Sequence, residues 1–302
     1  MKEYIEAITS FSCDFEYKLD LPLAHYSTFK IGGNADIMVF PRDERELVYS
    51  VKTAKDKGKK YFILGNGSNT LFSDNGYRGV VISTERLNNV VVNNTEIEAG
   101  VGASLTALSK TAQTNSLSGL AFAYGIPGNV GGALYMNAGA YGGEMSDVVV
   151  ESRYYNPSED KIFSLAGDEH KFSYRHSFYI ENPDFVILSA KLKLNKGNAC
   201  EILDEMKDYM ARRRDKQPLE YPSAGSVFKR CPGHFAGKLI EDSGLKGYTV
   251  GGAQVSEKHA GFIINIGGAK AKDVMDLIEY IKETVYKKHG VNLECEVKII
   301  GE

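Results

Sequence analysis

The sequence contains no tryptophan, only eight prolines and only four cysteines among its 302 residues. The cysteines lie far apart, and none forms a CxxC pair or has a histidine at the spacing of a metal site. We therefore expect structural thiols and no metal. The four are Cys13, Cys200, Cys231 and Cys295.

Neither sign of charge predominates, because 36 basic and 39 acidic residues give a formal net charge of −3. The longest basic cluster, Arg212 to Arg214, is too short to indicate a nucleic-acid surface. No apolar run approaches the roughly 18 to 20 residues that span a bilayer. Acidic residues within Met1 to Asp20 exclude the pattern of a secretory signal. We expect a cytoplasmic monomer that binds neither nucleic acid nor membrane.

Short strands separated by few helices, without a repeating βαβ spacing, predict an α+β fold. We expect residues 1–195 to form one domain, with subdomains 1–85 and 86–195, and residues 196–302 to form a second in which helices predominate. The pattern predicts helices over 43–58, 104–115, 200–214 and 271–289, and strands over 61–64, 80–83, 90–92, 148–155, 185–194 and 293–299.

Glycine is abundant, because 31 of the 302 residues are glycine, about a tenth of the chain, against an average share of about 7 %. One cluster, Gly65 to Thr70, directly follows a predicted strand, where backbone N–H groups can converge on a phosphate. It matches neither the Walker A nor the Rossmann pattern, and such a loop is more often a plain connection. Further clusters span 125–133 and 137–143. Tight packing through glycine is the alternative explanation for both.

These clusters, preceded by Thr28 to Gly33, resemble UDP-N-acetylenolpyruvoylglucosamine reductases over residues 25–301. That family has the two-part FAD-binding domain of the vanillyl-alcohol oxidase and p-cresol methylhydroxylase type, followed by an α+β substrate domain. The resemblance implies non-covalent FAD, with NADPH as co-substrate. The implied cofactor-binding residues are Leu64, Gly65, Asn66, Gly67, Ser68, Asn69, Thr70, Ile126, Pro127, Gly128, Gly131, Gly132, Ala138, Gly139 and Arg213.

Reduction of an enolpyruvyl double bond leaves an enolate-like charge that needs a cation, and a carbanion that needs a proton donor. By resemblance, Arg175 stabilises the charge, Ser226 donates the proton and Glu296 assists. Glu294 lies on the same face of the predicted strand as Glu296, and only the motif separates the two. Without the resemblance, all three would be ordinary surface or turn residues.

The remaining cleft residues are also assigned by resemblance. Tyr174, Lys216, Arg230 and His259 are the implied substrate contacts, although a lone histidine is more often structural. Arg175 and Ser226 lie too close in sequence for a long inserted loop, which is typical of the shorter, second type of the family.

The resemblance therefore implies NADPH-dependent reduction of UDP-N-acetylglucosamine enolpyruvate to UDP-N-acetylmuramate, a step of peptidoglycan precursor synthesis on which cell-wall biogenesis, cell shape and cell division depend. One alternative is a flavin oxidase of the same fold that passes electrons to oxygen. The other is a nucleotide-binding module without catalysis, and the joint presence of Arg175, Ser226 and Glu296 counts against it.

Overall fold

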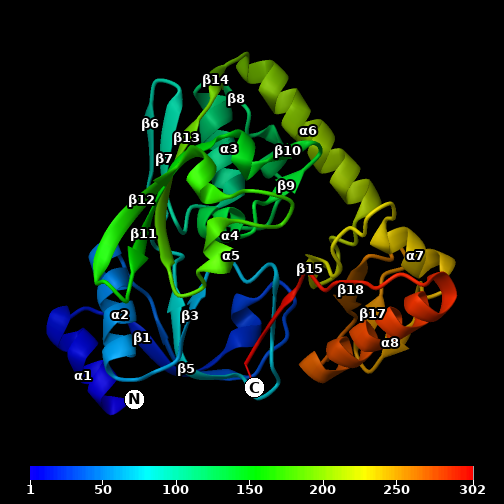
Figure 1. Cartoon of the computed structure of the whole chain (residues 1–302), viewed down its shortest axis with the longest axis horizontal. Helices are drawn as coiled ribbons and strands as arrows, with labels where there is room; N and C mark the ends of the chain where they lie inside the picture. Colours follow the sequence, from blue (N-terminus) through cyan, green and yellow to red (C-terminus); the bar gives the residue numbers. More distant parts are fainter. Residues whose placement is uncertain (302) are drawn as a thin grey trace. The chain divides into compact units, whose positions relative to one another are not determined.

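The computed structural model describes residues 1–301, and Figure 1 shows the helices and strands along the chain. By its internal contacts the chain divides into two compact units. Unit 1 comprises Met1–Lys18, Ile37–Asn66 and Gly79–Arg212. Unit 2 comprises Leu19–Asp36, Gly67–Arg78 and the chain from Arg213 onward. Among the described residues, no helix is both long and apolar enough to cross a membrane.

The core of unit 1 is a five-stranded antiparallel sheet in the order β12-β11-β13-β7-β6. The central strand β13 is buried over its first five residues, because its apolar sequence is covered on both faces. Helix α3 buries Leu105, Leu108 and Ala112 at helical spacing, and its N-cap Ser104 accepts a hydrogen bond from the Ala107 N–H. The strands are β6 (Val90–Asn93), β7 (Glu96–Gly100), β11 (Val149–Asn156), β12 (Lys161–Ala166) and β13 (Val186–Lys193), and α3 is Leu105–Thr114.

A second sheet has the order β1-β2-β5-β3, in which β3 and β5 run parallel. The chain passes from one unit to the other within β1, β2 and β5. The bounds are β1 (Tyr17–Pro22), β2 (Asn34–Val39), β3 (Tyr61–Leu64) and β5 (Tyr77–Ser83), with helices α1 (Lys2–Phe11) and α2 (Glu44–Asp56) in the same part of the chain.

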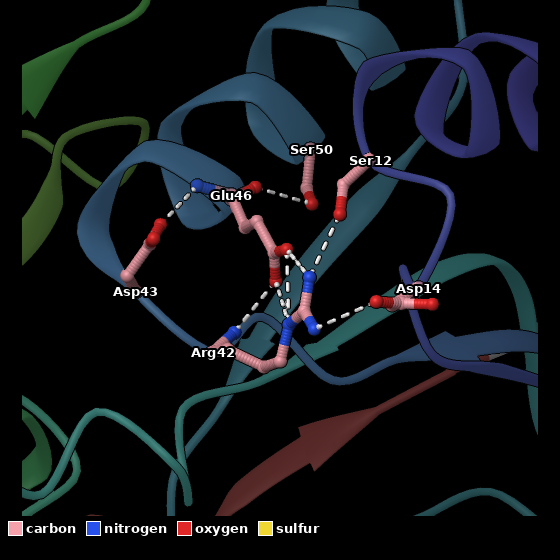
Figure 2. A network of polar contacts seen from close by, with 6 residues as sticks. All are labelled: Ser12, Asp14, Arg42, Asp43, Glu46 and Ser50. Carbon is pink, nitrogen blue, oxygen red and sulfur yellow. Dashed lines mark hydrogen bonds and ion pairs between the residues drawn. The ribbon is translucent and has the colours of Figure 1, made fainter.

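A buried carboxylate fixes the start of α2 (Figure 2). Glu46 is only 4 % exposed, and it accepts hydrogen bonds from the Arg42 backbone N–H (2.8 Å) and guanidinium (2.6 Å). Burial raises the pKa of Glu46, but the bonds from Arg42 outweigh it, so that the pKa lies below its ordinary value. Asp43 caps α2 by accepting from the Glu46 N–H, and Arg42 also donates to Ser12 beyond α1. The network therefore joins the two helices.

Unit 2 contains a four-stranded antiparallel sheet in the order β15-β18-β17-β16. Helix α8 packs against β16 and β17 through an apolar stripe that includes Val274, Leu277 and Ile281, and it ends at Gly290, whose φ of 68° is left-handed. A separate parallel pair joins β4 to β19. The bounds are β4 (Thr70–Phe72), β15 (Ser223–Ser226), β16 (Thr249–Val250), β17 (Ala253–Val255), β18 (Phe262–Asn265), β19 (Lys298–Ile300), α7 (Ala236–Asp242) and α8 (Ala271–His289).

The remaining elements of the described chain are mostly short. They are η1 (Leu23–Tyr26), β8 (Leu117–Ser118), η2 (Ala121–Ala123), α4 (Val130–Tyr135), β9 (Gly139–Ala140), β10 (Gly143–Glu144), η3 (Met145–Asp147), η4 (Gly167–His170), α5 (Phe178–Glu181), β14 (Asn195–Lys196) and the longer α6 (Ala199–Lys216).

All four predicted helices are present, and the bounds of β3 and α8 match the prediction. The predicted strand over 293–299 is wrong, since only Lys298–Ile300 is a strand and Ile299 is 47 % exposed. Its residues bond to two different partners, a loop near Phe228 and then β4. Beyond residue 196, helices α6, α7 and α8 hold more residues than the strands, as predicted, and a four-stranded sheet accompanies them.

Candidate active site

The loop after β3 presents unused backbone donors. Leu64, the last residue of β3, is 1 % exposed, and Gly67 has a left-handed φ of 59°. A Cβ at Gly67 would lie 2.2 Å from the Tyr26 carbonyl oxygen, so only glycine fits. Within residues 1–301, the N–H groups of Asn66, Gly67 and Ser68 donate to no protein acceptor. Three successive donors of this kind fit the phosphates of a dinucleotide.

The first two glycine clusters meet within unit 1. The Asn66 side chain donates from Nδ2 to the Pro127 carbonyl oxygen (2.6 Å). A Cβ at Gly65 would lie 2.5 Å from Oδ1 of Asn129, which is itself 5 % exposed. The structure therefore brings together the segments around residues 65 and 128, which the sequence separates by some sixty positions.

The two glycines at the start of α4 differ in what surrounds them. The Gly131 N–H donates to the Val101 carbonyl oxygen (2.9 Å), and a Cβ there would lie 2.3 Å from a Val101 methyl group. The Gly132 N–H donates to Asn129 Oδ1 (3.2 Å), but a Cβ at Gly132 would meet nothing closer than 3.4 Å. Packing against Val101 therefore accounts for Gly131, in agreement with the alternative explanation of tight packing through glycine. Gly132 is exposed instead and has room for a methyl group.

The third cluster continues from α4. Ala138 is 6 % exposed, and Gly139 pairs with Glu144 across the β9–β10 hairpin. A Cβ at Gly139 would lie 2.7 Å from the Glu144 Cβ, so this glycine allows the hairpin to close. Of the remaining predicted residues, Ile126 packs on the core of unit 1, and the Gly128 carbonyl oxygen accepts the Leu105 N–H (3.0 Å).

Arg175 occupies a strained turn in unit 1. Ser173 and His176 form an isolated bridge, which leaves Tyr174 and Arg175 as a two-residue turn. The φ of Arg175 is 53°, in the left-handed region that favours glycine or asparagine. Its guanidinium carbon lies 5.2 Å from the Tyr174 ring centroid. Strained backbone at a non-glycine residue is frequent at functional sites, so this feature supports a role for Arg175.

Ser226, in unit 2, follows a β-bulge in strand β15. On β15, Ser223 is opposite Ile264 and Ser226 is opposite Phe262, so that three steps on β15 match two on β18. Gly225 provides the required backbone, with a φ of 76°. The Ser226 hydroxyl donates to the Phe228 carbonyl oxygen (3.2 Å). Bulges of this kind re-aim a side chain relative to a regular strand.

Glu296 lies on the segment next to Ser226. Its N–H donates to the Val227 carbonyl oxygen (2.7 Å), and its own carbonyl oxygen accepts from Asn69 Nδ2 (3.1 Å). We call residues 65–70, whose backbone donors fit phosphates, the phosphate-type loop. The structure therefore brings Ser226, Glu296 and the end of this loop onto adjacent segments of unit 2. Glu294 instead has a 71 % exposed side chain that pairs with Lys229, which favours Glu296 as the functional carboxylate.

His259 lies close to Ser226. A Cβ at Gly261 would lie 3.0 Å from His259 Cε1 and 3.5 Å from Ser226 Oγ. His259 Nδ1 accepts the Gly261 N–H (3.1 Å), so the imidazole carries its proton on Nε2. Burial lowers the pKa of His259 below its ordinary value, which keeps the ring neutral.

The remaining predicted residues lie on α6 and in the loop after β15. Arg213 and Lys216 lie in the last turn of α6, and Arg230 follows β15. Beside Lys216, the buried Oε1 of Gln217 has no hydrogen-bond partner among the described residues. Arg175 belongs to unit 1, whereas Ser226, Glu296 and His259 belong to unit 2.

Two buried asparagines were not among the residues predicted from the sequence. Asn129 caps α4, and its place just before a helix is a signal that the glycines around it concealed. Asn137 is fully buried and has a left-handed φ of 45°. No local pattern distinguishes Asn137, because its partners lie elsewhere in the chain.

Comparison with known proteins finds two family models that match parts of the chain. The FAD binding domain family matches residues 35–163, and the C-terminal domain family of UDP-N-acetylenolpyruvoylglucosamine reductase matches residues 217–300. The chain is 49 % identical to the UDP-N-acetylenolpyruvoylglucosamine reductase of Caldanaerobacter subterraneus subsp. tengcongensis, with 94 % of this chain and 93 % of that one covered. It is 50 % identical to that of Clostridioides difficile, with 95 % and 94 % covered.

Solved structures support the fold. The crystal structure of the reductase from Thermus caldophilus superposes with a TM-score of 0.80 at 33 % identity, covering 95 % of this chain and 98 % of that one. An alkyldihydroxyacetonephosphate synthase reaches a TM-score of 0.50 at 18 % identity, over 65 % of this chain and 44 % of that one, which reflects fold alone. The predicted fold class and the enzyme class, an FAD-dependent oxidoreductase, are confirmed. By its relatives over nearly its full length, the chain belongs to the UDP-N-acetylenolpyruvoylglucosamine reductase family.

Proposed function

We propose that the protein uses NADPH to reduce UDP-N-acetylglucosamine enolpyruvate to UDP-N-acetylmuramate in the cytoplasm, as a step of peptidoglycan precursor synthesis. The relatives' names support the substrate and the reaction. The observation that carries the proposal is the bulged Ser226 beside Glu296, on segments that adjoin the phosphate-type loop.

The glycine-rich segments fit a non-covalently held FAD. The free N–H groups of Asn66, Gly67 and Ser68 would bind its diphosphate, and the open surface at Gly132 would lie against it. FAD supplies a carrier that accepts hydride from NADPH and donates it to the substrate. The other residues assigned to the cofactor by sequence, Arg213 among them, remain part of the same proposal.

Three side chains carry out the proton and charge chemistry. The Arg175 guanidinium would stabilise the negative charge that develops on the substrate carboxylate and enolate. Ser226 would donate a proton to the adjacent carbon, and Glu296, on the neighbouring segment, would resupply it. A serine hydroxyl is a weak acid, so nearby donors must stabilise the alkoxide that it leaves.

The substrate is a dianionic nucleotide sugar with an additional carboxylate. Lys216 and Arg230 would neutralise its charges, and Tyr174 and the neutral His259 would donate hydrogen bonds. We also propose that residues 1–195 bind FAD, that residues 196–302 bind the substrate, and that the protein acts as a monomer.

The test separates the two half-reactions under anaerobic conditions. The purified protein should carry a flavin absorbance that NADPH bleaches and that the enolpyruvyl nucleotide restores. Ser226→Ala should leave bleaching nearly intact and slow restoration about 10²-fold or more. If an alcohol and oxygen yield hydrogen peroxide while the nucleotide does nothing, the protein is an oxidase instead.

A further inference from the structure

The turn that carries Arg175 is tied to the segment that leaves α4. Ser173 and His176 exchange both backbone hydrogen bonds, at 3.2 and 3.1 Å, and so close the turn of Tyr174 and Arg175. The Ser173 carbonyl oxygen accepts a second hydrogen bond, from the Nδ2 of Asn137 (3.1 Å). The side chain of Asn137 therefore contacts the residue from which the turn begins.

Asn137 is well suited to hold a fixed position. It is fully buried, and both ends of its amide are used, since Oδ1 accepts the Ser146 N–H (2.9 Å) while Nδ2 donates to Ser173. Its left-handed φ of 45° is tolerated better by asparagine than by most residues. A buried side chain with every polar atom satisfied has one orientation, because any other would leave a donor or acceptor unpaired.

A second bond holds the other end of the turn. The hydroxyl of Ser177, which is fully buried, donates to the Tyr135 carbonyl oxygen (2.7 Å) at the end of α4. The turn is thus fixed before Tyr174 and after His176 by residues on either side of Met136. The same stretch of chain continues directly into Ala138 and Gly139, which are proposed to contact the flavin.

We propose that Asn137 is a positioning residue that sets the place of Arg175 relative to the flavin-binding segment that follows α4. The inference rests on the proposed role of Arg175. Its physical basis is that one amide side chain bonds to the Arg175 turn while its own backbone is continuous with Ala138. A displacement of about 1 Å at a catalytic group can cost 10²-fold in rate, so loss of this link should slow the step that Arg175 serves.

The first experiment removes the amide without straining the backbone. In Asn137→Gly, glycine suits the positive φ, so the variant isolates the loss of the side chain. Asn156→Ala is the matched control, because Asn156 is also buried, donates once and accepts once, but is the last residue of β11. We expect Asn137→Gly to slow substrate reduction by the reduced holoenzyme about tenfold, with flavin reduction by NADPH and the control both close to wild type.

A readout independent of activity follows the turn itself. Hydrogen exchange at the amides of Ser173 and His176 should be faster in Asn137→Gly and unchanged in Asn156→Ala. Asn137→Asp adds a positive signature, since a protonated carboxyl can donate to Ser173 and an ionised one cannot. The rate of substrate reduction by Asn137→Asp, divided by the wild-type rate at the same pH, should therefore rise as the pH falls.

A double-mutant cycle decides between positioning and a separate effect. In the Arg175→Ala background, Asn137→Gly should slow substrate reduction no further. A full additional tenfold loss there, or an Asn137→Gly enzyme as fast as the control, would overturn the inference. If Arg175→Ala alone leaves the rate unchanged, the proposed role of Arg175 fails, and the exchange measurement then decides whether Asn137 orders the turn.

Discussion

Replacing Arg175 by glycine should make the protein more stable than replacing it by alanine, although both variants lose activity. The left-handed φ of 53° costs an L-residue about 1–2 kcal/mol. Glycine avoids this cost, but its greater freedom in the unfolded chain lowers the stability of the folded protein by about 0.4–1 kcal/mol. The difference leaves the glycine variant ahead of alanine by about 1 kcal/mol. Both variants lose the contact with Tyr174 equally, so it cancels from the comparison.

The assay compares the two variants by thermal and urea unfolding. About 1 kcal/mol corresponds to roughly 2 °C in a chain of this length. A second pair, Ser116→Gly and Ser116→Ala, provides the control, because Ser116 also has a positive φ (56°) but no predicted role. We expect a similar stability gain at Ser116 without loss of turnover, whereas either Arg175 variant should slow substrate reduction about 10²-fold or more.

Two results would refute this reasoning. Equal stability of Arg175→Gly and Arg175→Ala, with a clear difference at Ser116, would mean that the turn is not strained. Full turnover by Arg175→Gly would remove the guanidinium from the mechanism. Together the two measurements separate the backbone cost of Arg175 from the catalytic use of its side chain.

Further predictions concern the cofactor site, the core and the pH dependence of stability. Gly132→Ala should fold normally but weaken FAD binding in a fluorescence titration, whereas Gly131→Ala should lower the melting temperature because its Cβ meets Val101. Burial holds the pKa of His170 below its ordinary value, so the unfolded state takes up a proton first as the pH falls below about 6.5. Stability should then fall by up to about 1.4 kcal/mol per pH unit, less steeply in His170→Gln. The pKa of Glu46 is lowered, so its contribution to stability is present above about pH 4.5 and is lost below it. In Glu46→Gln, the melting temperature should therefore fall less steeply as the pH drops below about 4.5.

Sequence patterns predicted the helices well because their signals are local. The apolar stripe of α8 and the cap of α2 at Asp43 depend on residues within a few positions of each other. The alternation over 293–299 also looked local, but the backbone there bonds first near Val227 and then to β4, more than 200 positions earlier. Alternation alone cannot specify a change of partner.

For the site, the motifs indicated which segments matter but not the function of each residue within them. Gly131 and Gly132 are equivalent in sequence, yet one packs on Val101 and the other faces open space. The link from Asn137 to Ser173 joins residues 36 positions apart, a separation that no helical or strand period encodes. The shape of the turn at Arg175 likewise became visible only in the backbone angles.

The interleaving of the two units limits how the protein can be divided. The chain leaves one unit for the other after residues 18, 36, 66, 78 and 212. No single cut therefore releases either unit as a continuous fragment, and the cut after Asn66 would sever the phosphate-type loop itself. During synthesis, residues 19–36 and 67–78 must wait for the C-terminal third of the chain before their unit can close. Truncation or splitting of the chain at a single position should therefore yield unfolded halves, and fusion partners belong at the chain ends.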